Sequence, residues 1–89
     1  MITVDRNGTP IREGDILMHC WTKISGDFFK SGKDLRKGEF VTANFVDDDG
    51  TFTANGWDNP NGERFWFHGI EFEVVVHERE FTPDEVDFF

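Results

Sequence analysis

The sequence predicts a mainly β fold, either a small antiparallel SH3-like barrel or a strongly bent sheet, with a short C-terminal helix. Three observations predict it: stretches in which polar and apolar residues alternate, compact turns rich in Gly, Asn and Asp between them, and a helix-start signal near residue 82. A chain of 89 residues has room for one hydrophobic core. We therefore expect residues 1–89 to form a single domain.

Two turns and a strand form the predicted centre of the fold. Asn7-Gly8 and Glu13-Gly14-Asp15 are expected chain reversals, because glycine accepts the positive φ that tight turns require. Residues 16–21 are apolar at neighbouring as well as alternate positions, which is typical of a strand buried on both faces. Residues 2–4 are expected to add a short edge strand.

A long loop follows over residues 23–37. Glycine and serine interrupt it, and Phe28-Phe29 is its apolar pair. We interpret the two rings as anchors that hold the loop on the core. The alternative is a contact surface that combines the rings with the lysines on either side.

Four more strands are expected over residues 39–47, 51–57, 63–68 and 70–78, separated by turns at 48–50 and 58–62 and by a bend at Gly69. The apolar positions on the inward side of the strands define the expected core, which comprises Ile16, Met18, Val41, Phe45, Phe52, Phe65, Phe67, Phe72, Val74 and Val76.

The last residues predict the short helix. Thr82-Pro83-Asp84-Glu85 is a capping box with proline at the first helical position, and Phe81 and Val86 are spaced to form a hydrophobic staple. We expect one or two helical turns that end at Phe88-Phe89, with these two rings docked on the barrel.

The chain holds eleven Phe and three Trp, more rings than a core of this size requires. Some rings are therefore expected on the surface, where the candidate contact residues are Trp57, Trp66 and the pair Phe28-Phe29. The single cysteine, Cys20, excludes an internal disulfide and is expected to be a small buried residue.

No run of apolar residues approaches the ~20 residues of a membrane span, and residues 1–10 lack the apolar centre of a signal peptide. We expect a cytoplasmic protein without membrane contact.

Charge is distributed unevenly along the chain, whose formal net charge is −9. Residues 1–46 carry seven basic and six acidic side chains, whereas residues 47–89 carry two basic and twelve acidic ones. A strongly negative half repels nucleic acid and attracts basic proteins. The candidate partner-binding carboxylates lie at the 48–50 turn and at outward positions of the last strand, and they are Asp47, Asp48, Asp49, Glu71 and Glu73.

Residues 5–17 carry the pattern D-x-N-G-x-x-I-x-x-G-D-I, formed by Asp5, Asn7, Gly8, Ile11, Gly14, Asp15 and Ile16. In this segment the chain resembles the YopX-like proteins of phages and prophages, with Arg12 at a place where that family often has an aromatic residue. The resemblance implies a small β-rich protein of phage type and brings no catalytic residue with it.

The sequence offers little for metal binding or catalysis. Asp47-Asp48-Asp49-Gly50 does not belong to a calcium-binding loop, because the first and twelfth ligand positions are held by residues that cannot ligate. His19 and Cys20 point to opposite faces of a strand, which leaves His68 and His77 as a cross-strand pair. No activated nucleophile and no phosphate-binding loop is apparent. We predict a protein without enzymatic activity, cofactor or metal.

Two functional classes then remain. The first is an inhibitor, of the anti-CRISPR or anti-restriction kind, that presents carboxylates to a host nucleic-acid-binding protein where phosphates would bind. The second is a general β-barrel protein-interaction module that uses exposed aromatic residues. A nucleic-acid binder acting through the basic loop 23–37 comes third, because the net charge of the whole chain opposes it. We therefore expect a protein partner with a basic surface and no direct binding of nucleic acid.

Overall fold

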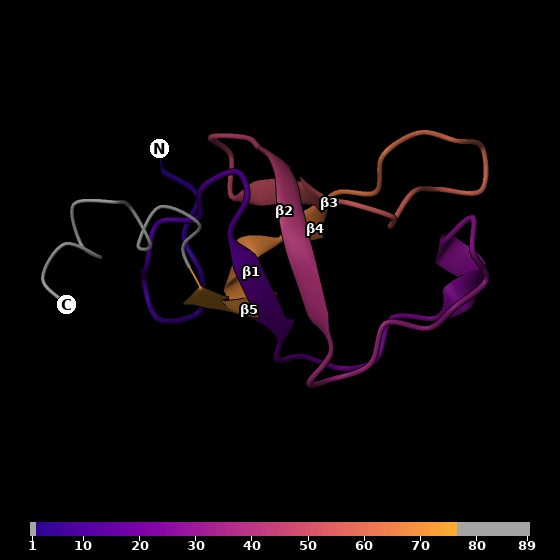
Figure 1. The fold of residues 1–89 in the computed structure, drawn as a ribbon, viewed down its shortest axis with the longest axis horizontal. Coiled ribbons are helices and arrows are strands. Elements are labelled where there is room, and N and C mark those ends of the chain that lie inside the picture. Colours follow the sequence, from indigo (N-terminus) through magenta and orange to yellow (C-terminus); the bar gives the residue numbers. More distant parts are fainter. Residues whose placement is uncertain (1, 77–89) are drawn as a thin grey trace, which may run out of the picture.

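The computed structural model describes residues 2–76 and shows one five-stranded antiparallel sheet (Figure 1). Its strands are β1 (Ile16–His19), β2 (Phe40–Val46), β3 (Thr51–Ala54), β4 (Phe67–His68) and β5 (Phe72–Val76), in the order β4-β3-β2-β1-β5. Two short 3-10 turns complete the described elements, η1 (Gly26–Phe28) and η2 (Gly69–Glu71). The prediction of a mainly β fold with a bent sheet is confirmed.

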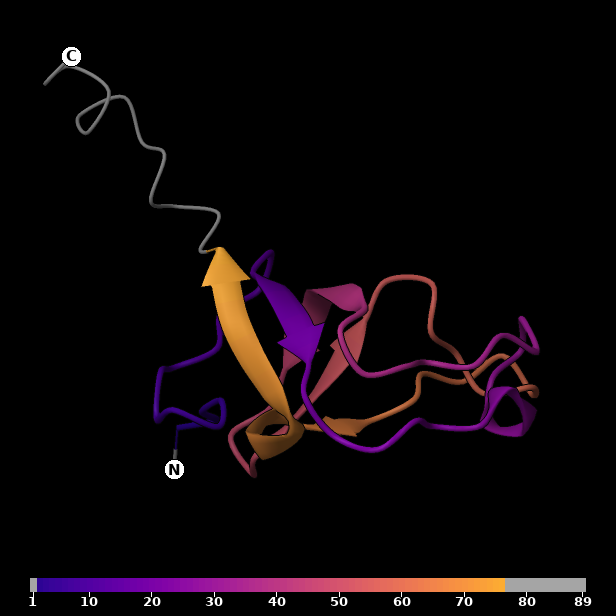
Figure 2. The ribbon, with the colours of Figure 1, turned by 90° about the horizontal axis from the view of Figure 1, so that it is seen from below.

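The sheet is strongly bent because β4 and β5, which follow one another in the chain, lie at its two opposite edges (Figure 2). Only η2 separates them in sequence, so the sheet curls to bring both edges to one turn. β4 and β5 do not pair with each other, and the barrel is therefore not closed.

Gly69, at the start of η2, lies where the backbone comes very close to its neighbours. A Cβ atom on this residue would lie 2.4 Å from the carbonyl oxygen of Val4 and 2.9 Å from Cδ1 of Ile11. The Gly69 N–H donates to the carbonyl oxygen of Gly50 at 3.0 Å, which ties η2 to the β2–β3 hairpin. The bend expected at Gly69 exists, and close packing is the reason for glycine there.

The core fills the inside of the bent sheet. Its centre is a cluster of three rings from three strands: Phe72 lies edge-on against Phe52 and Phe67, with ring centroids 5.1 and 5.4 Å apart. The buried apolar residues are Ile11, Leu17, Phe29, Leu35, Val41, Ala43, Phe52, Ala54, Phe67 and Phe72. Val41, Phe52, Phe67 and Phe72 were predicted correctly, and Phe65 and Val74 pack against this cluster while partly exposed.

The predicted inward face of β1 is wrong. Leu17 and His19 are fully buried, whereas Ile16 is 36% exposed and Met18 is half-buried on the outer face. The core covers only one face of the described sheet, in which β1 is a central strand. Because β1 is apolar on both faces, its sequence did not indicate which face would be buried.

Phe45 is also wrongly placed by the prediction, because β2 contains a bulge. Ala43 pairs with Ala54 but Phe45 pairs with Thr53, so two positions of β2 match one step of β3. The bulge reverses the alternation and turns Phe45 outward, where it is 44% exposed. Val76, expected inside, is half-buried.

Other predicted elements are shorter than expected. Residues 2–4 contribute only a bridge between Val4 and Pro10, and of residues 63–68 only β4 is a strand. The loop 23–37 is present and projects beside the 58–64 turn (Figure 1). The Lys30 N–H donates a hydrogen bond of 2.7 Å to the Asp58 carbonyl oxygen of that turn. His77, the helix at Thr82 and the docking of Phe88-Phe89 lie outside the described residues.

Among the helical segments of residues 2–76, none has the length and apolar character needed to span a membrane.

Candidate binding surfaces

The segment that resembles the YopX-like proteins builds turns. Asp5 is buried and its carboxylate accepts three backbone hydrogen bonds, from Asn7 and Thr9 at 2.8 and 2.9 Å and from Val74 of β5 at 2.8 Å. Because backbone donors satisfy this buried charge, Asp5 acts as a cap that ties the first turn to the edge strand.

Asp15 has a comparable role in the second turn. It is 1% exposed, its carboxylate accepts from the Arg12 N–H at 2.8 Å, and its carbonyl accepts from the Ala43 N–H at 2.9 Å. Gly14 supplies the positive φ of 88° and donates to the Ala43 carbonyl at 2.8 Å. The residues that carry the resemblance are thus used to position β1 between β2 and β5.

The predicted acidic residues at the 48–50 turn form the tip of the β2–β3 hairpin. Asp47 accepts the Asp48 N–H at 2.8 Å, and Asp49 accepts the N–H and the hydroxyl of Thr51. The hydrogen bond from the Thr51 hydroxyl lowers the pKa of Asp49 below its ordinary value of 3.8. Thr3 fixes the tip from below, since its hydroxyl donates to the Asp47 carbonyl and accepts from the Gly50 N–H.

Among the described residues 2–76, no carboxylate of the tip takes part in an ion pair. Within residues 2–76, the only ion pairs join Asp34 to Lys23 and to Arg36. Asp48 and Asp49 are exposed. The hairpin therefore presents carboxylates to the solvent.

Glu71 and Glu73 lie elsewhere. Glu71 belongs to η2 rather than to the strand and lines an apolar cleft. Glu73 lies on β5 opposite Met18 and accepts a hydrogen bond from Asn7 Nδ2 at 3.1 Å. The structure thus separates these two residues from the hairpin tip.

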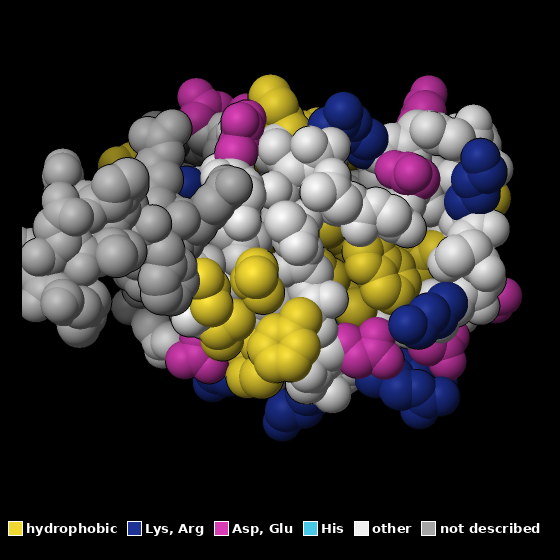
Figure 3. Space-filling model, in the orientation of Figure 1, with side chains coloured by type: hydrophobic (Ala, Val, Ile, Leu, Met, Phe, Trp, Pro, Cys, Tyr) yellow, Lys and Arg dark blue, Asp and Glu magenta, His cyan; other side chains and the backbone are white. Residues whose placement is uncertain are grey.

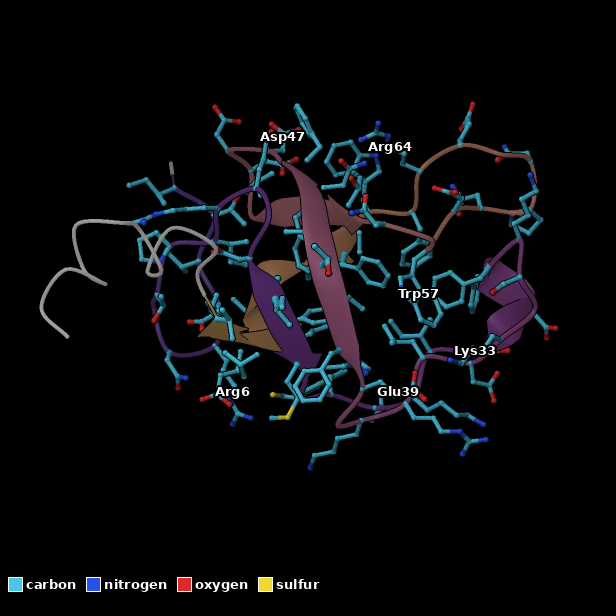
Figure 4. The ribbon with its side chains drawn as sticks, viewed as in Figure 1. Arg6, Lys33, Glu39, Asp47, Trp57 and Arg64 are labelled. Atoms are coloured by element: carbon cyan, nitrogen blue, oxygen red, sulfur yellow. The ribbon has the colours of Figure 1, made fainter. Side chains whose placement is uncertain are left out.

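Two exposed rings lie beside the hairpin tip instead. Phe45 and Trp66 form a T-shaped pair with centroids 5.8 Å apart and an interplanar angle of 87°, and they are 44% and 43% exposed. Phe45 lies on β2, two residues before Asp47. Figure 4 shows Asp47 and Arg64 along the same edge of the molecule. We call this surface the acidic-aromatic edge and define it as Phe45, Trp66, Asp47, Asp48 and Asp49.

The other predicted aromatic residues divide between core and surface. Phe29 is 3% exposed and packs on Trp57 and Phe65 with centroids 4.8 and 4.9 Å apart, so it anchors the loop 23–37 as interpreted. Phe28 is 58% exposed and does not. Trp57 is half-buried, with the Lys33 ammonium 6.0 Å from its ring centroid, and both residues are labelled in Figure 4.

Sequence reasoning missed two surface pockets that share Trp21 and Thr22. The apolar cleft has a volume of about 320 Å³ and is lined by Trp21, Thr22, Ile24, Phe28, Phe65, Phe67, His68 and Glu71. The basic pocket has a volume of about 600 Å³ and is lined by Cys20, Trp21, Thr22, Lys23, Arg36 and Lys37. Because the alternation assigned residues 16–21 to one buried strand, Trp21 was not predicted to be a surface residue. Trp21 lies past the end of β1 and is 58% exposed.

In the described part of the chain, no three His, Cys, Asp or Glu side chains lie close enough together to hold a metal ion. Cys20 is half-buried beside the basic pocket rather than inside the core.

Comparison of the chain with family models, with curated proteins and with solved structures finds no match in any of the three. The resemblance to YopX-like proteins stays a prediction.

Proposed function

We propose that this chain is a non-enzymatic binding protein that engages a basic surface of a partner protein through its acidic-aromatic edge. The observation that carries the proposal is the position of an exposed ring pair, Phe45 and Trp66, beside the carboxylates of the hairpin tip, which form no ion pair within residues 2–76. This position joins in one surface the two features that the sequence suggested separately.

The two parts of the edge have different physical roles. Aromatic residues that are partly exposed before binding supply most of the contact energy in protein interfaces. The carboxylates speed the encounter and select a positive partner, an effect that decays over a Debye length of ~8 Å at physiological salt. The partner that fits is a protein with Lys and Arg side chains around an apolar recess.

A nucleic-acid-binding protein of a phage host has such a surface in its phosphate-binding groove. An inhibitor of the anti-CRISPR or anti-restriction type follows from the proposal, with the hairpin carboxylates in the place of phosphates. The phage-type resemblance of residues 5–17 supports this choice of partner.

The experiment isolates the partner from bacterial lysate and then measures its affinity for four variants over a range of salt concentrations. Asp48→Lys and Trp66→Ala alter the edge. Asp27→Lys and Phe40→Ala are the matched controls, because Asp27 is exposed on η1 and Phe40 is 61% exposed at the start of β2, both away from the hairpin tip.

We expect Asp48→Lys to weaken binding and to flatten its dependence on salt, and Trp66→Ala to weaken binding by tenfold or more at every salt concentration. The controls should bind as the parent does. Loss in Trp66→Ala alone would favour a general aromatic interaction module, with charge incidental. Parental affinity in both edge variants would disprove the proposal.

A further inference from the structure

The basic pocket is built on a two-stranded, hydrogen-bonded ribbon, only part of which is regular strand. Residues 19–24 run beside residues 35–39: the His19 N–H donates to the Glu39 carbonyl at 2.8 Å and the Gly38 N–H to the His19 carbonyl at 2.7 Å. Further along, Ile24 and Leu35 exchange two hydrogen bonds of 2.9 and 3.0 Å. The pocket residues of the two segments are therefore held opposite one another.

One carboxylate positions two of the three cations in the pocket. Asp34 lies 3.4 Å from the Lys23 ammonium and 3.8 Å from the Arg36 guanidinium. The Gly26 N–H donates to the other Asp34 oxygen at 2.6 Å, and this bond, followed by the charges of Lys23 and Arg36, lowers the pKa of Asp34. The single negative charge of Asp34 offsets one of the three positive charges of the pocket. Lys37 has no ion pair among residues 2–76.

Trp21 gives the pocket a flat apolar wall. It is 58% exposed and is shared with the apolar cleft, where the 58% exposed Phe28 lies. Cations and an exposed indole side by side are the combination with which proteins bind a nucleotide unit, because the phosphate needs charge and the base needs a stacking surface. The pocket volume of about 600 Å³ lies within the range of small-ligand sites.

The pocket lies far from the carboxylates of the hairpin tip, although Glu39 is near it and Glu71 lines the adjoining cleft. Figure 4 marks the two ends of β2 with Glu39 near the pocket and Asp47 at the hairpin tip. The seven residues of β2 separate these ends by roughly 20 Å at ~3.3 Å per residue, more than twice the Debye length at physiological salt. Figure 3 shows Lys and Arg side chains on the lower right of the face it presents, with Asp and Glu side chains among them.

We propose that the basic pocket binds a nucleotide unit, with the base stacked on Trp21 and the phosphate held by Lys23, Arg36 and Lys37. Thr22 also lines the pocket. The unit comes either from a free nucleotide or from single-stranded nucleic acid, whose next base enters the adjoining cleft beside Phe28 and Phe65. This site is separate from the acidic-aromatic edge and does not depend on it.

The test titrates the whole chain with four probes: a nucleoside 5′-monophosphate, the corresponding nucleoside, inorganic phosphate, and a single-stranded oligothymidylate. Calorimetry gives affinity. The rate at which a thiol reagent modifies Cys20 gives a site-specific signal, because this residue is the only cysteine and lines the pocket. We expect the monophosphate to bind more tightly than nucleoside or phosphate alone, to protect Cys20, and to weaken as salt rises.

Three variants locate the site. Trp21→Ala should weaken nucleotide binding on the order of tenfold through loss of stacking, and Lys37→Gln should weaken it and reduce the salt dependence. Lys30→Gln removes a cation of the same loop from outside the pocket and should bind as the parent does.

The oligonucleotide identifies the source of the nucleotide unit. An affinity well above that of the monophosphate assigns the site to single-stranded nucleic acid, and an equal affinity assigns it to a free nucleotide. The proposal is wrong if neither probe binds at millimolar concentration, if phosphate alone binds as well as the monophosphate, if Trp21→Ala binds as the parent does, or if an acidic peptide containing Trp competes equally.

Discussion

At the scale of single residues, two buried polar side chains on either side of β5 contrast sharply. Asp5 is 2% exposed and its carboxylate accepts three backbone hydrogen bonds. His19 is fully buried against Phe72, with ring centroids 5.0 Å apart, and neither ring nitrogen has a hydrogen-bond partner in the described structure. Burial of a polar group stabilises the fold only where partners replace the lost water.

We therefore expect Asp5→Ala to be strongly destabilising. The substitution leaves three N–H groups without their acceptor, at about 1–3 kcal/mol for each one that water cannot reach. The free energy of unfolding in urea measures the loss. The exposed Asp48 provides the control, because Asp48→Ala should change it by no more than about 0.5 kcal/mol. Equal effects of the two substitutions would contradict the capping role of Asp5.

His19→Leu should have the opposite sign. Leucine fills most of the same space and removes two ring nitrogens that have lost water and gained no partner, so stability should be unchanged or higher by about 1 kcal/mol. The melting temperature gives the result. Leu17→Ala, at the other inward position of β1, is the comparison and should cost about 2–5 kcal/mol. A large loss in His19→Leu would mean that the imidazole has a specific structural role.

At the scale of elements, the bulge in β2 explains why the sequence predicted burial correctly before the bulge and wrongly after it. Val41 follows the alternation and is buried, but after Ala43 the register shifts and Phe45 faces outward. The residue types at positions 43–45 do not indicate a bulge, because a bulge depends on the pairing with β3 rather than on local propensity. The hairpin turn itself was predictable, since Gly50 has the positive φ of 96° that its sequence context indicates.

The two faces of the sheet can be compared through two phenylalanines. Phe72→Ala empties the centre of the core and should cost about 3–5 kcal/mol. Phe45→Ala removes only an exposed edge-to-face contact with Trp66, worth about 0.5–1.5 kcal/mol. Chemical denaturation of both variants measures the difference. If the two losses are equal, Phe45 faces the core and the bulge is misplaced.

At the scale of the whole molecule, the sequence indicated residues of the candidate surfaces but not which of them lie next to one another. Trp66 and the hairpin carboxylates were predicted separately, and only the outward turn of Phe45 joins them. The basic pocket was not predicted, because it arises where residues 20–23 and 36–37 run side by side in an irregular ribbon. Local patterns specify strands and turns, whereas such contacts depend on tertiary pairing.

The position of β1 also has a consequence for the time course of folding. β1 pairs with β2, the next strand in the chain, and with β5, the last one described. Its pairing with β5 therefore cannot form until residues 72–76 have left the ribosome. Until then, the buried side chains of Leu17 and His19 lack their packing against Phe72. Pairings of such long sequence separation form late and limit the folding rate. During synthesis the β2–β3 hairpin can form early, and β5 completes the described sheet.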